Sequence, residues 1–449
     1  MLLRWRKPAI WAYTLAMNPR KLVKKVIPSS IFRQIEPYGH LLEAMLMQTI
    51  NGFPAKDIKV IGVTGTNGKT STSFLIHRML HEAGYKVGLM TTVGYGVGAN
   101  IKPQIQHMTT ASSGLLLKRI KAMRDEGMEW LVLETTSHGL AQHRVWGIPY
   151  SIAVMTNVTH EHLDYHGTFE RYRDAKRLLF TQTDSNHKGM RAGVINAEDP
   201  SAELFKSDIS RALTYGLKQG DIRAEKVVLK PNEVSYIARA KEQSYDIKCR
   251  LPGSFNVANS LAAVCVGNLL GLSKTQIEAG IAALEGVEGR MMSIEEGQKF
   301  NVIIDFAHTP DSFEKLFNDL RPAVKGKLLV LFGSAGRRDE AKRAVQGSLA
   351  AKYADEVVIT EEDDRDIDGV EIMNQIAAGA ESEGKVRDKD LFLVHDRTEA
   401  IRFVFARAKP GDTVLLLGKG HEKTIERADG EYPWNEMQVA RDALKQYAD

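Results

Sequence analysis

The sequence has little cysteine and no long apolar run. Its 449 residues include two cysteines, Cys249 and Cys265. This count excludes a disulfide framework and a zinc ribbon and favours a reducing compartment, so we expect a cytoplasmic protein. No apolar run approaches the roughly 18 residues that span a bilayer, and no signal peptide is recognisable. The net charge of +4 is small for this length, so nothing global predicts a nucleic-acid partner.

A Gly-rich turn follows an apolar strand at residues 60–71, which read Val-Ile-Gly-Val-Thr-Gly-Thr-Asn-Gly-Lys-Thr-Ser. Gly65 and Gly68 allow the backbone to turn tightly and point N–H groups at an anion. Lys69 is placed for the outer phosphates and the Thr70 hydroxyl for Mg²⁺. The strict P-loop pattern is not met, because valine stands where its first glycine belongs. We therefore predict a variant P-loop that binds ATP and Mg²⁺.

Apolar strands alternate with helices from residue 58 onward, which predicts an α/β fold with a parallel sheet covered on both faces. The first strand candidates are 60–63, 130–134, 151–158, 193–196 and 227–236, and the helix candidates are 71–83, 113–126, 168–181 and 256–270. A second run has strand candidates 302–306, 327–332, 356–360, 391–394 and 413–417. We expect a central P-loop parallel-sheet ATPase domain at 58–288 and a C-terminal Rossmann-like α/β domain at 289–449. Their site-bearing edges would face each other across a cleft.

Residues 1–57 differ from the rest, with nine lysines and arginines against three acidic residues, interleaved with aromatic and aliphatic side chains. One interpretation is a segment, residues 1–50, that lies on an anionic membrane surface. The other is an N-terminal helix pair packed on the next domain with solvated lysines. Pro8, Pro19 and Pro28 favour the second, because they break any long amphipathic helix.

Polar residues follow the strands where chemistry is expected. Glu134 ends an apolar strand, and a buried carboxylate there is costly unless it meets a cation, of which Mg²⁺ is the obvious one. The next strand is followed by His160, His162, Asp164 and His166. Zinc fits this composition, but the absence of cysteine ligands and the neighbouring phosphate site favour Mg²⁺ and substrate. Lys176 lies on a predicted helix, where a lysine is ordinarily solvated.

Several short motifs follow one another along the chain. They are Gly65-Thr-Asn-Gly-Lys-Thr, Glu134-Thr-Thr-Ser-His-Gly-Leu, Thr156-Asn, His162-Leu-Asp-Tyr-His-Gly, Ala175-Lys, Phe255-Asn-Val-Ala-Asn, Gly289-Arg-Met, Asp305-Phe-Ala-His-Thr-Pro-Asp and Gly418-Lys-Gly-His-Glu. Together they resemble the Mur ligase family, and within it the MurE type, over about residues 58–449. The resemblance implies cytoplasmic, ATP-dependent amide synthesis in peptidoglycan precursor synthesis. A muramoyl-peptide-like carboxylate would accept the γ-phosphoryl group, and the amine of an amino acid would attack the acyl phosphate.

The resemblance also implies roles for individual residues. The catalytic residues would be Lys69, Glu134, His162 and Lys176. The Mg²⁺ ligands would be Thr70, Glu134, His162 and Lys176, the last as a carbamate. This role would place Lys176 in the site and not on the solvated surface. ATP would contact Gly65, Thr66, Asn67, Gly68, Lys69, Thr70, Asn256, Arg290, Asp305 and His308. The acceptor would contact Thr109, Thr110, Thr136, Gln142 and Arg144.

The incoming amino acid would contact Arg338, Glu362, Asp363, Asp364, Arg365, Gly418 and Glu422. MurE enzymes that add meso-diaminopimelate carry Asp-Asn-Pro-Arg, and this chain has Glu362-Asp-Asp-Arg365 there. An arginine and a carboxylate suit a zwitterionic end, so diaminopimelate is our first prediction, with lysine or another amino acid open.

The N-terminus departs from the family pattern, because the 57 residues before the first strand do not resemble the family's N-terminal domain, which binds the UDP portion of the substrate. A UDP-linked and a lipid-linked acceptor therefore both remain open. Two rival functions also remain: another ligase of this superfamily, folylpolyglutamate synthetase-like or acting on a lipid-linked precursor, and a membrane-associated P-loop ATPase switch. The switch leaves the second domain unexplained. We expect a monomer.

Overall fold

A computed structural model describes residues 29–104, 109–230, 232–337 and 339–447. At the centre of its first sheet lies β1 (Lys59–Thr64), which pairs in parallel with β5 (Trp130–Glu134) on one side and β6 (Tyr150–Met155) on the other. All three are buried along almost their whole length, which explains their apolar sequences. Within the described residues, no helix is long and apolar enough to cross a membrane.

The first sheet has 11 strands within the described residues, and its centre is parallel, with antiparallel strands at both edges. Its order is β11 (Ser244–Cys249), β10 (Val234–Arg239), β9 (Ile222–Leu229), β8 (Arg211–Gly216), β7 (Ala192–Asn196), β6, β1, β5, β2 (Val87–Met90), β3 (Gly94–Val97) and β4 (Asn100–Pro103).

Helices cover both faces of this sheet. One face packs against α3 (Lys69–Glu82), α9 (Ser254–Leu269) and α10 (Lys274–Ala282). The other packs against α4 (Ser113–Asp125) and α7 (Phe169–Ser185). Shorter helices lie near the site and the edges: α5 (Ser137–Ala141), α6 (Leu163–His166) and α8 (Ala202–Ser207).

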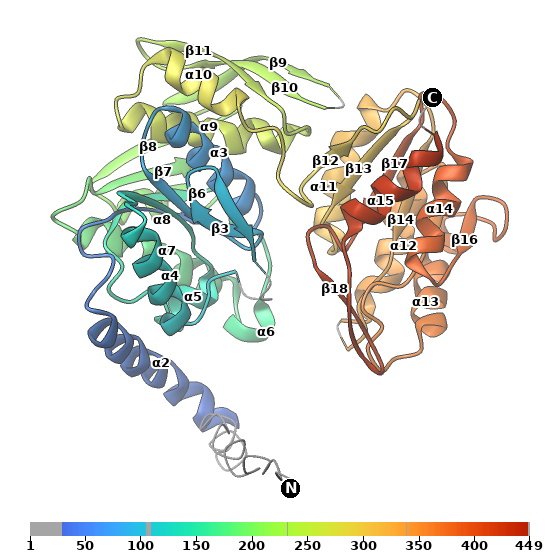
Figure 1. Ribbon diagram of the computed structural model, residues 1–449, viewed down its shortest axis with the longest axis horizontal. Helices are drawn as coiled ribbons and strands as arrows, with labels where there is room; N and C mark the ends of the chain where they lie inside the picture. Colours follow the sequence, from blue (N-terminus) through green and yellow to red (C-terminus); the bar gives the residue numbers. More distant parts are fainter. Residues whose placement is uncertain (1–28, 105–108, 231, 338, 448–449) are drawn as a thin grey trace, which may run out of the picture.

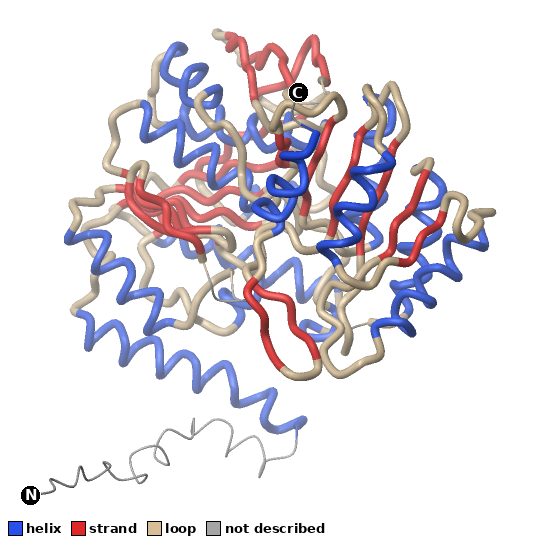
Figure 2. Tube along the Cα trace, turned by 45° about the vertical axis from the view of Figure 1, so that its right-hand side comes forward, coloured by secondary structure: helices blue, strands red, loops and turns tan. Residues whose placement is uncertain are grey.

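A second, smaller sheet follows in the chain and lies beside the first part in both views (Figures 1 and 2). Its order is β12 (Met292–Ile294), β13 (Asn301–Asp305), β17 (Thr413–Leu417), β14 (Leu328–Phe332), β15 (Glu356–Ile359) and β16 (Leu391–Leu393). It is parallel except for β12. On one face lie α11 (Pro310–Leu320), α12 (Ala341–Tyr353) and α13 (Gly369–Ser382), and on the other α14 (Arg397–Arg407) and α15 (Glu436–Leu444).

Smaller elements complete this part. The short helices η2 (Arg321–Ala323) and η3 (Lys445–Tyr447) extend α11 and α15, and a hairpin of β18 (Thr424–Arg427) and β19 (Gly430–Pro433) follows β17. The predicted α/β fold, a P-loop parallel-sheet part followed by a Rossmann-like part, is confirmed.

One sequence prediction about strands needs correction, and three four-residue strands of the first sheet were missed. The single strand predicted at 227–236 is wrong: β9 ends at Leu229, and β10 runs back antiparallel from Val234. The Lys230 N–H donates to the Glu233 carbonyl in the turn between them (2.9 Å), and the Pro-Asn pair in this stretch is a turn signal. The strands β2, β3 and β4 were not predicted, because four-residue strands give too short an alternation to recognise.

Helix α2 (Ser29–Asn51) packs against α4. Its Gln48 amide donates to the Trp146 carbonyl (2.9 Å). The packing agrees with the predicted N-terminal helix for this half of the segment. Residues 1–28 lie outside the described residues, so the second helix of the predicted pair stays a prediction.

Candidate active site

The Gly-rich turn joins β1 to α3 with two glycines in backbone conformations that favour glycine. Gly65 has φ +148° and Gly68 has φ +82°. A Cβ on Gly65 would lie 1.9 Å from the Thr156 hydroxyl, and one on Gly68 would lie 2.2 Å from the Asn259 side-chain oxygen. Neither position has room for another residue. The turn therefore holds the N-terminus of α3 close to the ends of its neighbours, in a position that suits an anion.

Glu134 is buried at the end of β5, 1% exposed, and is held against the P-loop. Its Oε2 accepts from the Thr70 hydroxyl (3.0 Å) and the Thr92 N–H (3.0 Å). Its Oε1 accepts from the Thr92 hydroxyl (3.2 Å), whose oxygen shares a second hydrogen bond with the Thr109 hydroxyl (2.8 Å). These contacts place a carboxylate and hydroxyl oxygens together beside the phosphate turn. Oxygen donors of this kind are those that Mg²⁺ prefers.

Lys176 is buried beneath the same turn, 1% exposed. Its ammonium donates to the Gly65 carbonyl (2.6 Å) and lies 4.4 Å from the centre of the Tyr172 ring. Burial lowers the pKa of Lys176 well below its ordinary value, and the charge of Lys69 lowers it further, while Glu161 and Glu134 oppose the shift. The local sequence context predicted a solvated surface lysine, and this prediction is wrong. The family resemblance, which implied a role in the site, gave the better prediction of its position.

His162 lies among aromatic rings after β6. Its backbone has φ +55°, and its ring centre is 4.7 Å from that of His138 and 6.0 Å from that of Tyr172. The Tyr172 hydroxyl shares a hydrogen bond with Thr66 of the P-loop (3.0 Å). This contact ties the histidine cluster to the phosphate turn.

The P-loop and the residues around Glu134 form the first wall of the site, and the second part of the chain supplies the second wall. Asp305, at the end of β13, accepts from the N–H groups of Met291 (2.7 Å) and Ala307 (2.8 Å), and burial raises its pKa. The Arg290 guanidinium lies 4.9 Å from the centre of the Phe306 ring. The Arg290 Nε is buried without a hydrogen-bond partner among the described residues. Burial lowers the pKa of His308, which lies in the loop after β13.

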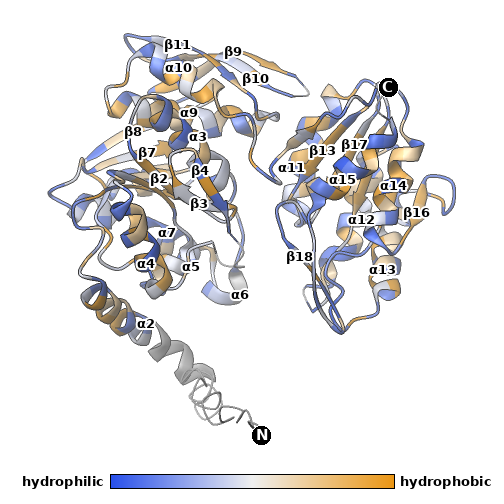
Figure 3. Ribbon diagram, viewed as in Figure 1, coloured by the Kyte–Doolittle hydropathy of each residue, from blue (hydrophilic) through white to orange (hydrophobic). Residues whose placement is uncertain are grey.

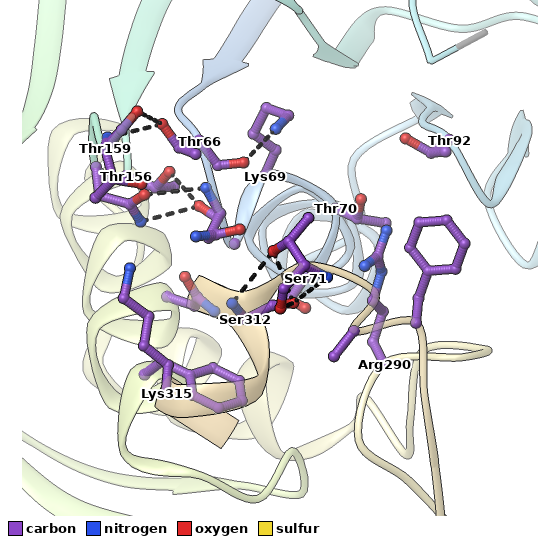
Figure 4. A pocket seen from close by; sticks show the side chains of 18 of the residues that line it. Thr66, Lys69, Thr70, Ser71, Thr92, Thr156, Thr159, Arg290, Ser312 and Lys315 are labelled. Carbon is purple, nitrogen blue, oxygen red and sulfur yellow. Dashed lines mark hydrogen bonds between the residues drawn. The ribbon is translucent and has the colours of Figure 1, made fainter. Parts of the chain in front are cut away.

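These two walls enclose one cavity of about 540 Å³. Figure 4 shows Arg290, Ser312 and Lys315 from the second part on the side opposite Lys69 of the P-loop. Predicted residues that line it are Thr66, Asn67, Gly68, Lys69, Thr70, Thr109, Glu134, Thr136, His162, Asn256, Arg290, Asp305 and His308. Gly65 and Lys176 lie directly behind this lining. The structure thus brings together side chains that are more than 200 positions apart in the sequence.

The predicted acceptor residues form a connected group at the Glu134 end of the cavity. The Thr110 hydroxyl donates to the Glu134 carbonyl (3.3 Å) and accepts from the Thr136 N–H (3.0 Å). Arg144 donates to the Thr110 carbonyl (2.6 Å) and, through Nε, to the Gln142 side chain (2.8 Å). A cationic side chain is therefore fixed next to a row of threonine hydroxyls.

The predicted amino-acid residues gather at the carboxyl ends of β15 and β17 and do not line this cavity. Lys419 donates to Asp363 (2.9 Å) and Glu422 (2.7 Å), and Asp364 pairs with His395 (2.7 Å). Burial alone lowers the pKa of Lys419, but these carboxylates raise it above its ordinary value.

Arg365, with φ +57°, pairs with Glu426 and donates to the Gly336 carbonyl (2.8 Å). Glu362 is buried, and a Cβ on Gly418 would lie 2.6 Å from its carboxylate. Arg338 lies outside the described residues.

Sequence reasoning missed several residues of the site. Thr92 follows the unpredicted strand β2, and the rule that polar residues after a strand mark a site would have found it once that strand was known. Asn259 accepts from Thr72 (3.3 Å) and packs on Gly68; it ends the Phe255-Asn-Val-Ala-Asn motif, but no role was predicted for it. Glu426 lies in the β18–β19 hairpin, and only the fold brings it to Arg365.

A P-loop beside a buried carboxylate, closed by a second α/β part, defines a nucleotide-dependent α/β enzyme with a two-walled site. The chain matches the Mur ligase middle domain over residues 63–267 and the Mur ligase glutamate ligase domain over residues 289–420. The chain belongs to the Mur ligase family. It is an ATP-dependent ligase that forms carbon–nitrogen bonds.

Known proteins similar to this chain carry related names. One is a UDP-N-acetylmuramyl-tripeptide synthetase from Roseiflexus sp., 39% identical, with 91% of this chain and 82% of that protein covered. Another is a UDP-N-acetylmuramoyl-L-alanyl-D-glutamate–2,6-diaminopimelate ligase from Geobacillus thermodenitrificans, 38% identical, with 92% and 84% covered. A solved structure of a ligase with this second name is 29% identical, with a TM-score of 0.64 and 92% and 83% covered.

The tight fit of Gly68 predicts a nucleotide-binding defect in Gly68→Ala. The matched control is Gly84→Ala, because Gly84 has a similar φ of +91° at the other end of α3 but open space around it. We expect both substitutions to cost about 1–2 kcal/mol of stability from backbone strain. Only Gly68→Ala should raise the Kd for ADP, by about tenfold or more, because its methyl group displaces Asn259 or the turn. Calorimetric ADP titrations check this, and equal Kd values in the two variants would contradict it.

The buried amine of Lys176 predicts a pH-dependent gain in stability. The unfolded chain binds a proton at Lys176 that the folded chain binds only at lower pH, so stability rises with pH between the depressed folded pKa and about 10.4. In carbon-dioxide-free buffer, the free energy of unfolding of the wild type relative to Lys176→Met should rise across this window, by at most about 1.4 kcal/mol per pH unit. Denaturant titrations at several pH values measure it. Lys206→Met, at an exposed site, should show no such trend; a flat difference for Lys176→Met would refute the assignment.

Proposed function

We propose that this ligase joins an amino acid to the carboxylate of a muramoyl-peptide acceptor in peptidoglycan precursor synthesis. The observation that carries the proposal is the contact between Glu134 and Thr70. It joins the phosphate turn to the threonine–arginine group, so the γ-phosphoryl group of ATP and a substrate carboxylate would meet at one point. The relatives support the acceptor chemistry, since their names specify muramoyl-peptide ligases.

The described residues fit ATP and Mg²⁺. Thr70 and Glu134 would hold the metal through oxygen, with His162 at the same cavity and Lys176 completing the set as a carbamate. A carbamate forms only on a neutral amine, and burial lowers the pKa of Lys176 in the direction that favours that form. Bound Mg²⁺ would neutralise charge shared between ATP and the acceptor carboxylate.

The remaining steps fall to groups of the chain itself. The N–H groups at the start of α3 and the ammonium of Lys69 would hold the outer phosphates in line with the acceptor. Arg144 and the hydroxyls of Thr109, Thr110 and Thr136 would hold the acceptor. Asn256, Arg290, Asp305 and His308 would hold the nucleoside end and, with the second wall, exclude water from the acyl phosphate.

We further propose that the working unit is a cytoplasmic monomer with functional boundaries at residues 57/58 and 288/289. Both walls of the cavity come from one chain, which supports a monomer. The first wall ends before Glu288 and the second begins with Arg290, which supports the second boundary.

Meso-diaminopimelate is our proposed amino acid. The Arg365–Glu426 pair offers a cation for its distal carboxylate and a carboxylate for its distal ammonium. Glu362 and Glu422 add negative charge at the neighbouring strand end, next to Gly418. A relative 38% identical is named as a diaminopimelate ligase, which supports the same choice.

A ligase releases phosphate only when both substrates are present. We expect phosphate release to need a muramoyl-peptide acceptor and an amino acid together, whereas an ATPase switch would hydrolyse ATP without either. Mass spectrometry of the product, with UDP-linked and lipid-linked acceptors in separate reactions, identifies the acceptor. Steady hydrolysis that neither substrate stimulates would overturn the proposal.

The amino-acid assignment predicts a selective defect in Arg365→Ala. For diaminopimelate, the substitution should lower kcat/KM by about 10-fold or more, since a charge-assisted bidentate contact is lost. With lysine, which lacks the distal carboxylate, the residual activity should change little. Kinetics with a panel of amino acids check both, with Arg402→Ala, on the exposed face of α14, as the control. An equal loss with both amino acids would reject the role of Arg365.

A further inference from the structure

Helix α2 presents a row of large apolar side chains to solvent. Its inner face packs through Ala44 and Gln48, which are 1% and 0% exposed. The outer face, here called the α2 stripe, consists of Tyr38, Leu42, Met45, Leu46, Ile50 and, just past the helix end, Phe53. Tyr38, Leu42 and Ile50 are 65–70% exposed. Single exposed apolar residues are ordinary, but a row at helical spacing marks an interaction surface.

The stripe lies away from the active site. In Figure 1, α2 extends from the first part below α4, and in Figure 3 the coloured half of this helix, next to α4, carries hydrophobic residues. The stripe therefore takes no part in enclosing the cavity, whose lining includes none of its residues. Whatever binds the stripe is therefore not a substrate of the reaction.

A second copy of the chain fits this surface poorly. Residues 38–50 span about 20 Å of a helix about 10 Å wide, so two stripes packed together would bury roughly 400 Å² in total. Specific, stable protein interfaces bury about 1,200 Å² or more. A flat apolar layer, in contrast, accepts a narrow helical stripe without needing a matching partner surface.

The basic sequence before the stripe, and the exposed basic residues near it, favour an anionic layer. Residues 1–28, which precede α2, contain seven lysines and arginines, no acidic residue, and Trp5 and Trp11. Exposed Lys56 follows the stripe and is followed by exposed Asp57. Exposed Lys118, Lys121 and Arg124 lie on α4, the helix against which α2 packs, with exposed Asp125 at its end, so basic residues outnumber acidic ones here. Basic residues next to an amphipathic helix favour anionic lipid headgroups.

We propose that the α2 stripe and the basic residues beside it dock this enzyme on a bilayer surface of anionic lipids. The apolar side chains enter the headgroup boundary, and the exposed side chains of Lys56, Lys118 and Lys121 face the lipid charges. Docking through α2 leaves the two-walled cavity open to its substrates. The inference is independent of which amino acid and acceptor the enzyme uses.

Vesicle flotation tests the proposal with the full chain and needs no enzyme assay. We expect the wild type to float with phosphatidylcholine vesicles containing phosphatidylglycerol, and to stay in solution with phosphatidylcholine alone. The triple variant Leu42→Ser, Leu46→Ser, Ile50→Ser should need about tenfold or more lipid for half-binding, because binding scales with buried apolar area. The matched control is Val345→Ser, Val370→Ser, Val386→Ser, at exposed apolar positions of the second part, and should bind as the wild type does.

Each alternative occupant has its own outcome. A thermal melt first shows that both triple variants fold. Wild type that remains in solution with all vesicles, or a stripe variant that binds as tightly as the wild type, overturns the proposal. A wild-type dimer in sedimentation velocity that the stripe substitutions dissociate makes a second copy the occupant and overturns it too. Stronger vesicle binding after removal of residues 1–28 would make that segment the occupant of the stripe in the full chain and would overturn the proposal.

Discussion

The hydrogen bond between the Thr70 hydroxyl and the buried carboxylate of Glu134 is the contact on which the rest of the site depends. A carboxylate that is 1% exposed is costly to bury unless donors and a cation surround it. The parallel order of β5, β1 and β6 brings this carboxylate to the phosphate turn, because parallel strands end at the same sheet edge. Glycines 65 and 68 then allow the turn to lie against its neighbours.

The second part of the chain closes the site on the side opposite the P-loop. It places Arg290, Asp305 and His308 opposite the P-loop and encloses the space between. Amide synthesis through an acyl phosphate needs this arrangement, since water would hydrolyse the intermediate in an open site. The charged cluster around Arg365 and Lys419 is kept apart from the cavity, so the amine would approach from the side of the second sheet.

Much of this site could be predicted from the sequence, because its elements are local. The P-loop turn, Glu134 at a strand end and the histidine run after β6 are each contiguous motifs, and the family resemblance connected them with Asn256 and Arg290. Contacts between distant segments could not be predicted in this way. Thr92 depends on a four-residue strand, and Glu426 reaches Arg365 only through a hairpin.

The position of Lys176 also could not be predicted from its local sequence. By its own sequence context it is an ordinary helical lysine, and only the family resemblance or the fold places it under the Gly65 carbonyl. The α2 stripe likewise becomes visible only when one face of the helix is seen to pack on α4.

The central claim is that the phosphoryl group of ATP passes to a substrate carboxylate between the two walls of the cavity. An acceptor labelled with oxygen-18 in its carboxylate tests this most directly. After turnover, mass spectrometry should find one labelled oxygen in inorganic phosphate, because that oxygen bridges carbon and phosphorus in the acyl phosphate. Label found in AMP, or phosphate without label, would contradict the account.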